Sequence, residues 1–343
     1  RQGWWCKVRI LLTGIGCPGG HALITNLKLQ EPEMFILGTN AHEQAVGSRM
    51  CDAFEETPWA YEKNYVDTII ELVKKYEIDI VFPQTSWEMF ELSKAGDEVR
   101  KHCRLLASNH ELVKVCENKY LMYEHLKGKM DIPEYCLVHS IEELEEAAAK
   151  LGYPENDVVF KPPVGKGNRG VRVMTEKADR FDLLFNGRPF AKYISLDELR
   201  KTVEGKEFPE LMVMEYLDGR EYKVNPVLVK GKMLICSVKD RLNFASGLAM
   251  GFEVISHDES VEYGKEVMKH IPMDYCVDIQ LRGGVLMEIN PRVSTFVYDK
   301  NYCPPYLALK LAMEEMTEAE VEGYQKNVPI GKKMFRYYGQ VDY

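Results

Sequence analysis

Along residues 7–108, short apolar runs alternate with longer segments whose apolar residues recur at helical spacing. Val8 to Leu12, Met34 to Leu37 and Ile78 to Phe82 are each short and apolar enough to be buried strands. The segment from Tyr65 to Tyr76 places its apolar residues three or four positions apart, as on one face of a helix. Strands that alternate with helices predict a parallel, doubly wound α/β sheet in this part of the chain.

After this region the pattern changes to an α+β arrangement. Glu111 to Lys127 has helical spacing, and from Val158 onward short strands and hairpins predominate. The 343 residues are enough for two or three domains or lobes with a real core.

Composition and charge narrow the class of protein. The formal net charge of −9 argues against a general nucleic-acid-binding surface. The nine cysteines contain no C-x-x-C pair and mostly lie in apolar runs, which is typical of reduced thiols in a cytoplasmic protein. No run approaches the length of a membrane-spanning helix, and the first residues are too short and polar for a signal peptide. We expect no membrane association.

The most informative segment is a predicted hairpin that turns at Gly283 and Gly284. Alternation along its two strands places four oxygen-bearing side chains on one face: Asp278, Gln280, Glu288 and Asn290. Arg292 follows just beyond. Such an oxygen-rich, open-sided site suits Mg²⁺, which takes one or two carboxylates and fills its remaining positions with phosphate oxygens and water. The competing interpretation is a solvated polar face on an edge hairpin.

A glycine-rich loop follows the strand that ends at Lys161. The loop and this strand supply flexible backbone and positive charge for phosphate binding through Lys161, Gly165, Lys166, Gly167, Arg169 and Gly170. It is not a Walker A loop, because the residues from Val171 to Met174 predict a strand where that motif needs a helix. A strand–loop–strand unit predicts a flap over a nucleotide. A flexible surface hairpin is the alternative, but it leaves a lysine on a buried strand unexplained.

Two further motifs are weaker. Gly14 to Gly19 fits G-x-G-x-x-G, but a dinucleotide site also needs an acidic residue after the second strand, where this chain has Asn40. These glycines then serve a tight turn that can hold an anion at a helix N-terminus.

The second weaker motif begins with the strand Leu211 to Met214, which runs into Glu215 to Tyr222. The backbone of this segment could form hydrogen bonds with the edge of an adenine ring, and Glu221 could accept hydrogen bonds from ribose hydroxyls. A plain β-turn with solvated acids is the alternative there.

Taken in order, these motifs resemble those of the ATP-grasp superfamily. They run from Asn118-Lys119-Tyr120 through K-P-x-x-G-x-G-x-x-G-V and E-Y-x-x-G-x-E-Y to D-x-Q and M-E-I-N-P-R. The likeness is to one half of the carbamoyl-phosphate synthetase large subunit and to stand-alone carboxylate–amine ligases, over nearly the whole chain. It implies a Rossmann-like pre-ATP-grasp domain (1–108), a central and lid lobe (109–214) and a C-terminal lobe with the metal site (215–343).

The resemblance also implies roles for residues around a bound nucleotide. Lys119 and Lys161 are expected to hold the ATP phosphates, and residues 165–170 to form the mobile lid. The main chain of the hinge is expected to contact adenine, with a carboxylate on the ribose; these residues are Glu215, Tyr216, Leu217 and, for the ribose, Glu221.

The same resemblance bears on the metal and the reacting group. Glu288 and Asn290 are expected ligands of Mg²⁺ or Mn²⁺, and either Asp278 or Gln280 supplies another, because the hairpin is shorter than in many members. Arg292 is expected to steady an acyl-phosphate. Asn225 departs from the pattern, since relatives often have an acidic residue there.

The reaction implied is ATP-dependent amide-bond formation between a small carboxylic acid and an amine, through an acyl-phosphate, with release of ADP and phosphate. Three alternatives stay open. They are a kinase-like or carbamate-forming variant that acts on bicarbonate and ammonia, a nucleotide-binding regulatory protein with a degenerate site, and a nicotinamide-dependent dehydrogenase. Family members are often dimers, so a homodimer is one expectation that nothing in the chain fixes.

Substrate identity is where the sequence is least informative. The acceptor pocket is expected between Lys239 and Gly251 and just after Arg292. Arg241 is a candidate carboxylate anchor through its planar, bidentate guanidinium, with a surface salt bridge as the alternative. Ser246 and Ser294 are candidate polar contacts.

Overall fold

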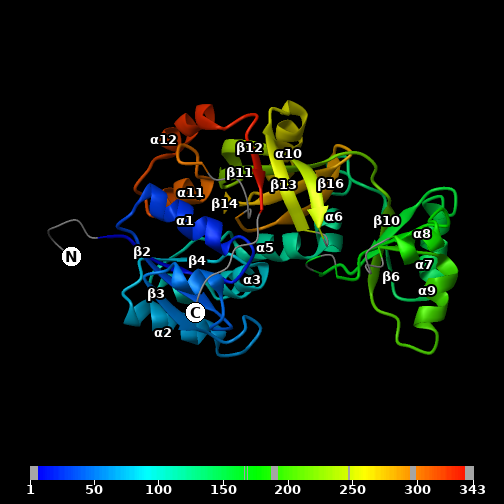
Figure 1. Ribbon diagram of the computed structural model, residues 1–343, viewed down its shortest axis with the longest axis horizontal. Coiled ribbons are helices and arrows are strands. Elements are labelled where there is room, and N and C mark those ends of the chain that lie inside the picture. Colours follow the sequence, from blue (N-terminus) through cyan, green and yellow to red (C-terminus); the bar gives the residue numbers. More distant parts are fainter. Residues whose placement is uncertain are drawn as a thin grey trace.

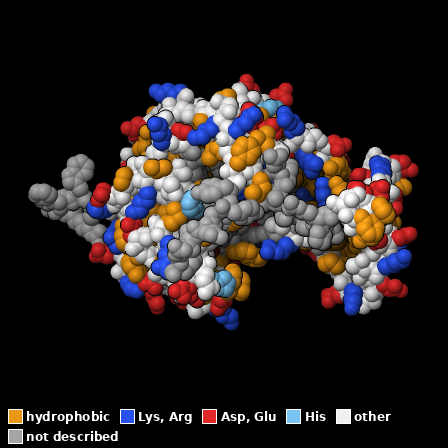
Figure 2. All heavy atoms as spheres, in the orientation of Figure 1, with side chains coloured by type: hydrophobic (Ala, Val, Ile, Leu, Met, Phe, Trp, Pro, Cys, Tyr) orange, Lys and Arg blue, Asp and Glu red, His pale blue; other side chains and the backbone are white. Residues whose placement is uncertain are grey.

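Three sheets with their helices build the described part of the chain (Figure 1). The structure is a computed structural model that describes residues 7–165, 167, 169–186, 192–245, 248–293 and 299–336, and the side chains of residues 243–249 lie outside this description. In Figure 1 the first and third sheets share the larger body, and the second sheet forms a lobe that projects to the right. The space-filling view shows the same projection (Figure 2).

The first sheet is parallel, in the order β3-β2-β1-β4-β5. Its strands are β1 (Arg9–Leu12), β2 (Phe35–Asn40), β3 (Ala53–Glu56), β4 (Ile80–Phe82) and β5 (Arg104–Leu105). Its helices are α1 (Gly20–Gln30), η1 (Val46–Arg49), α2 (Tyr65–Lys75), α3 (Ser86–Lys94) and α4 (Gly96–Arg100). The predicted parallel α/β sheet is therefore confirmed. Strand β3 was not predicted, because it lies at the sheet edge and its half-exposed residues form no apolar run.

The glycines between β1 and α1 form a tightly packed turn. Gly14 has a φ of +59°, which favours glycine. A Cβ atom on Gly20 would lie 2.2 Å from the carbonyl oxygen of Ile15, so only glycine lets the helix start this close to the strand. The side-chain oxygen of Asn40 accepts a hydrogen bond from the backbone N–H of Gly16 at 3.2 Å. These contacts account for the G-x-G-x-x-G spacing by packing.

The linking helices differ from the prediction. A single helix from Glu111 to Lys127 was expected, but this is wrong: the structure has α5 (His110–Glu117) and α6 (Lys119–Leu126). Asn118 breaks the helix with extended backbone angles, and its side-chain oxygen accepts a hydrogen bond from the backbone N–H of Leu121. Asparagine is a favoured N-cap because its side chain satisfies a free N–H group of the next helix. The break puts Lys119 at the first position of α6.

The second sheet forms the projecting lobe, in the order β6-β10-β7-β8-β9. Its strands are β6 (Tyr135–Val138), β7 (Val158–Lys161), β8 (Arg172–Met174), β9 (Tyr193–Ile194) and β10 (Leu211–Glu215). Its helices are α7 (Ile141–Lys150), α8 (Arg180–Phe185) and α9 (Leu196–Val203). Strands β7 and β8 pair antiparallel, so the glycine-rich loop joins two neighbouring strands as predicted.

The third sheet is antiparallel, in the order β16-β15-β11-β12-β13-β17, with β14 also paired to β11. Its strands are β11 (Glu221–Val229), β12 (Lys232–Ala245), β13 (Leu248–Ile255), β14 (Tyr275–Cys276), β15 (Asp278–Arg282), β16 (Val285–Asn290) and β17 (Lys333–Phe335). The remaining helices are α10 (Asp258–His270), α11 (Pro304–Ala312), α12 (Glu318–Glu322) and η2 (Gly323–Asn327).

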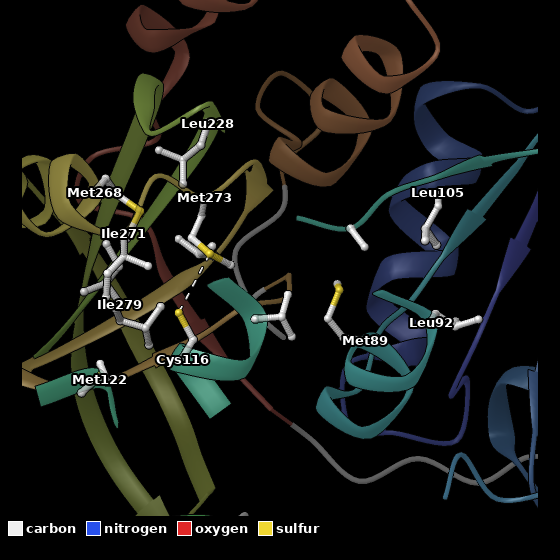
Figure 3. Packing of buried hydrophobic residues seen from close by; sticks show 14 of the residues in the cluster. Met89, Leu92, Leu105, Cys116, Met122, Leu228, Met268, Ile271, Met273 and Ile279 are labelled. Carbon is white, nitrogen blue, oxygen red and sulfur yellow. Dashed lines mark hydrogen bonds between the residues drawn. The ribbon is translucent and has the colours of Figure 1, made fainter. Parts of the chain in front are cut away.

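One apolar core joins the first and third sheets (Figure 3). Met89 and Leu92 of α3 belong to the same buried cluster as Met273 and Ile279 of the C-terminal part. Between them lies α5, whose Cys116 sulfur is 3.9 Å from the sulfur of Met273 (Figure 3). Burial of this shared surface fixes the first sheet against the third. In the described part of the chain, no helix has both the length and the apolar character to cross a membrane.

Candidate functional site

A cavity of about 500 Å³ lies where the three sheets meet. The first sheet contributes the loop after β1 and the start of α3, the second contributes the glycine-rich loop, and the third contributes its open face. The described lining includes Cys17, Gln84, Trp87, Lys119, Lys161, Gly165, Gly167, Arg169, Lys223, Arg241, Phe252, Asp278, Gln280, Glu288, Asn290, Arg292 and Arg336. Most of the predicted site residues are therefore brought together.

The β15–β16 hairpin gathers the four predicted oxygen-bearing side chains. Its register pairs Asp278 with Asn290, and Gln280 with Glu288. The turn glycines have φ values of +59° and +89°, as a two-residue type I′ turn requires. Directly paired residues project to the same face of a sheet, with Cβ atoms about 4.5–5.5 Å apart. All four side chains accordingly line the cavity.

Asp278 is held in a buried ion pair. Its carboxylate accepts hydrogen bonds from Lys223 Nζ and from Asn225 Nδ2, both at 2.8 Å, and the residue is 1% exposed. Burial opposes its ionisation, but the charges of Lys223, Lys239 and Arg292 outweigh this effect and hold the pKa of Asp278 well below its usual value. Asp278 is thus ionised and already provided with partners inside the protein.

We predict that Asp278→Asn lowers the free energy of unfolding by about 3–5 kcal/mol, because it removes the charged partner of Lys223, whose side chain is only 14% exposed. The pKa of Asp278 is lower in the folded protein than in the unfolded chain. The stabilisation by the ionised carboxylate is therefore complete above a pH of about 4 and is lost as the pH falls below that value. Urea unfolding at pH 7 and at pH 3.5 would measure both effects, with Glu98→Gln, which removes an exposed surface ion pair with Lys101, as the control. Equal unfolding free energies of Asp278→Asn and wild type at pH 7 would contradict the assignment.

Glu288 lies on β16 of the hairpin, and its side chain reaches Lys119 of α6. Its Oε2 is 3.3 Å from Lys119 Nζ, and its Oε1 accepts a hydrogen bond from Asn290 Nδ2, also at 3.3 Å. Burial opposes ionisation of Glu288, but Lys119, Lys161 and Lys223 outweigh it, so its pKa lies below the usual value. The carboxylate faces the cavity as an anion, ready to pair with a cation.

Lys161 ends β7 and is 6% exposed. Burial and the neighbouring charge of Lys119 together lower its pKa to about 7, against the opposing effect of Glu288. The amine is 6.0 Å from the ring centroid of Tyr123. A buried lysine whose proton is only loosely held gains strongly from an anion placed beside it.

Lys119 ties the base of the glycine-rich loop to the rest of the site. Its backbone N–H donates to the carbonyl of Pro163 at 2.9 Å, and its Nζ donates to the carbonyl of Gly165 at 3.2 Å. Gly167 and Gly170 have φ values of +63° and +74°, which favour glycine over other residues. The loop is thus anchored at one end and turns at positions that need glycine.

The predicted adenine hinge is not part of the described cavity lining. Glu215 makes two hydrogen bonds to the backbone of Glu134, one through its own N–H and one through Oε1. The hydroxyl of Tyr216 accepts from Arg282 at 3.2 Å. Glu221 is 8% exposed and forms an ion pair with Arg241. The predicted residues that do not line the described cavity are Gly170, Glu215, Tyr216, Leu217 and Glu221.

Of the predicted substrate residues, Arg241 lines the cavity. Three predicted residues, Lys166, Ser246 and Ser294, lie outside the described residues. Two basic residues in the cavity wall were not predicted: Lys223 and Arg336. Glu221, Lys223 and Asn225 are two residues apart along β11. Strand periodicity could therefore have placed Lys223 on the same face of the sheet as Glu221. Arg336 follows β17, far along the chain, and has no local motif.

Two family models match separate parts of the chain. Residues 207–329 match the model described as ATP-grasp in the biosynthetic pathway with Ter operon, and residues 10–105 match the PylC-like N-terminal domain. Residues 207–329 belong to an ATP-grasp domain. The superfamily predicted from its motifs is therefore confirmed, together with the mixed α/β architecture of a Rossmann-like domain followed by an ATP-grasp fold.

The relatives of this chain are distant. A stretch of 127 residues, 34% of the chain, is 29% identical to the carbamoyl phosphate synthase large chain, N-terminal section, of Aquifex aeolicus (strain VF5), and the match spans only 22% of that protein. Among solved structures, the ADP complex of PurK, N5-carboxyaminoimidazole ribonucleotide synthetase, is similar with a TM-score of 0.60 and 15% identity. That likeness covers 96% of this chain and 79% of PurK.

A second solved structure is the biotin carboxylase domain dimer of the 2-oxoglutarate carboxylase from Hydrogenobacter thermophilus, bound to MgADP, ADP and bicarbonate. Its TM-score is 0.64 at 14% identity, and the likeness covers 90% of this chain and 70% of that one. At these identities the structural likeness concerns the fold.

Proposed function

We propose that this ATP-grasp protein is an ATP-dependent carboxylate–amine ligase that forms an amide bond and releases ADP and phosphate. The observation that carries the proposal is the placement of Glu288 within one cavity that also contains Lys119, Lys161 and Arg292. A carboxylate for a metal, two lysines for phosphates and an arginine for the reacting acid are the groups this chemistry needs.

The donor set of the hairpin fits Mg²⁺, with Mn²⁺ as the other candidate. No group of three or more His, Cys, Asp or Glu side chains suited to a metal exists among the described residues. The hairpin offers a mixture of carboxylate and amide oxygens, as hard cations accept. We propose Gln280, Glu288 and Asn290 as ligands in preference to Asp278, which is paired with Lys223 and Asn225. When bound, Mg²⁺ would neutralise charge on the β- and γ-phosphates.

The two lysines would act on the ATP phosphates. Lys119 and Lys161 approach from α6 and β7, and both lie beneath the glycine-rich loop. Phosphate binding would replace Glu288 as the anion nearest to Lys119 and would hold Lys161 protonated. These two charges would draw electron density from the γ-phosphate as the substrate carboxylate attacks it.

Arg292 would orient the acid and stabilise the negative oxygen that forms when the amine attacks the acyl-phosphate. Two hydrogen bonds to neighbouring residues hold its guanidinium in place. Nη1 donates to the carbonyl oxygen of Val293 at 3.1 Å, and Nη2 donates to Oδ1 of Asn290 at 3.4 Å. Closure of the loop that carries Gly165, Lys166, Gly167, Arg169 and Gly170 would exclude water, which otherwise hydrolyses an acyl-phosphate.

Other parts of the proposal rest on the family resemblance. The main chain of Glu215, Tyr216 and Leu217 is proposed to contact adenine, and Glu221 the ribose. Ser246 and Ser294 are proposed substrate contacts. We also propose the division into residues 1–108, 109–214 and 215–343, and a homodimeric assembly. The eight described cysteines are all free, which supports a reducing, cytoplasmic location.

A carbamate-forming variant is the second candidate, favoured by the match to carbamoyl phosphate synthase. Release of ADP in the presence of MgATP, tested over pairs of acids and amines, would separate the two. A ligase is expected to release ADP with phosphate only when both an acid and an amine are supplied. ADP release that needs only bicarbonate and ammonia would support the carbamate variant, and no MgATP turnover with any pair would contradict both.

A further inference from the structure

The end of the cavity away from Glu288 is lined by basic side chains on one face of the third sheet. Arg241 on β12 pairs directly with Phe252 on β13, and Phe252 pairs with Met334, two residues before Arg336. Residues two apart on a strand face the same side, so Arg241, Phe252 and Arg336 project together into the cavity. The backbone N–H of Arg336 donates to the carbonyl of Met250, which fixes its position beside β13.

Basic groups outnumber acids in this cavity. The described lining has seven basic side chains, Lys119, Lys161, Arg169, Lys223, Arg241, Arg292 and Arg336, against three acidic ones, Glu117, Asp278 and Glu288. Even with Glu221 counted as the partner of Arg241, an excess of positive charge remains. The nucleotide phosphates would neutralise only the end that contains Lys119 and Lys161.

Several cationic side chains lie near Asp278. Lys223, Lys239 and Arg292 all act on this one carboxylate. Burial and the charges of Lys223, Arg336 and Arg292 together lower the pKa of Lys239 to about 7, against the attraction of Asp278. Like charges this close repel each other strongly in a poorly solvated site, and an anion would relieve the repulsion.

We propose that the substrates of this site carry a second anionic group, a carboxylate or a phosphate, which Arg241 and Arg336 bind. This inference rests on the proposed ligase function and specifies its substrate class. The first anion is the carboxylate activated beside Arg292. The second would lie over β12 and β13, two to three strand spacings, or about 10–14 Å, from Gln280 on β15. Arginine suits this role, since its planar guanidinium binds carboxylate and phosphate oxygens in pairs.

The second anion belongs either to the acid or to the amine, and matched ligand pairs distinguish these sources. Glutarate and pentanoate have the same chain length and differ by one carboxylate, as do glycine and ethylamine. Calorimetric titration of the MgADP-loaded protein would compare the first pair, and ADP release with a monocarboxylic acid would compare the second. We expect at least tenfold discrimination in favour of the more acidic member of one pair, which identifies the source.

Arg336→Gln is expected to abolish that discrimination, and Arg336→Lys to restore part of it. The matched control is Arg200→Gln on α9, where an exposed arginine pairs with Glu145. MgADP affinity should be unchanged in all three variants. The inference is overturned if neither pair is discriminated, or if Arg336→Gln discriminates as well as the wild type. If the protein did not bind MgADP, the proposed function would be rejected instead. Calorimetric titration of glutarate and pentanoate without nucleotide would then still test the anion site.

Discussion

Glu288→Gln is expected to lower kcat/KM for MgATP at least a thousandfold, or about 4 kcal/mol in activation free energy. The substitution keeps the size of the side chain but removes the anion that faces the cavity and lies 3.3 Å from Lys119. The amide would bind a divalent cation far less strongly than a carboxylate does. Steady-state ADP release, with an acid and amine pair identified by screening, would measure the effect.

The matched control is Glu253→Gln. Glu253 lies on β13 of the same sheet, pairs with Lys333, and does not belong to the described cavity lining. Its substitution should leave kcat/KM within about twofold, since surface ion pairs contribute about 0–1 kcal/mol. If Glu288→Gln retained wild-type turnover, Glu288 would not be a metal ligand.

The second large effect concerns the proton on Lys161. Because its pKa is about 7 in the free protein, only about one molecule in ten carries this charge at pH 8. Bound phosphate favours the charged form, so nucleotide binding above pH 7 should take up a proton. We expect the affinity for MgADP to fall about fivefold, or about 1 kcal/mol, as the pH rises from 7 to 8, because the protonated fraction falls from about one half to about one tenth.

Calorimetry at pH 8, in buffers that differ in ionisation enthalpy, would count the protons taken up. Lys161→Arg is the matched control, because arginine remains charged throughout this range and should remove the uptake. Lys239, Lys119 and Glu288 are present in both proteins, so any contribution from them is common to the two titrations. Equal proton uptake in Lys161→Arg and wild type would show that another group titrates.

Local periodicity was sufficient to predict the parts of the fold that lie close together in sequence. Alternation predicted that Asp278 and Gln280 share one face of their strand, and Glu288 and Asn290 one face of theirs. The turn alone would pair Gln280 with Met287, and a register shift between Gln280 and Leu281 brings Gln280 opposite Glu288, which alternation does not predict. Periodicity did not separate α5 from α6, since both carry apolar residues at helical spacing. The break depends on a single cap, Asn118, and it decides where Lys119 points.

Contacts between distant segments could not be predicted. The choice between Asp278 and Gln280 depends on Lys223 and Asn225, which reach Asp278 from a neighbouring strand. Arg336 enters the cavity only because β17 pairs with β13. Such pairings are set by packing of the whole sheet, and no short motif records them.

The account depends on a metal ion that Glu288 and its neighbours share with the nucleotide. Its most direct test is a titration of ADP into wild-type protein and into Glu288→Gln, each with and without Mg²⁺, followed by calorimetry. We predict that Mg²⁺ strengthens ADP binding to the wild type at least tenfold and has no effect on binding to the variant. An equal effect of Mg²⁺ on both proteins, or none on the wild type, would contradict the account.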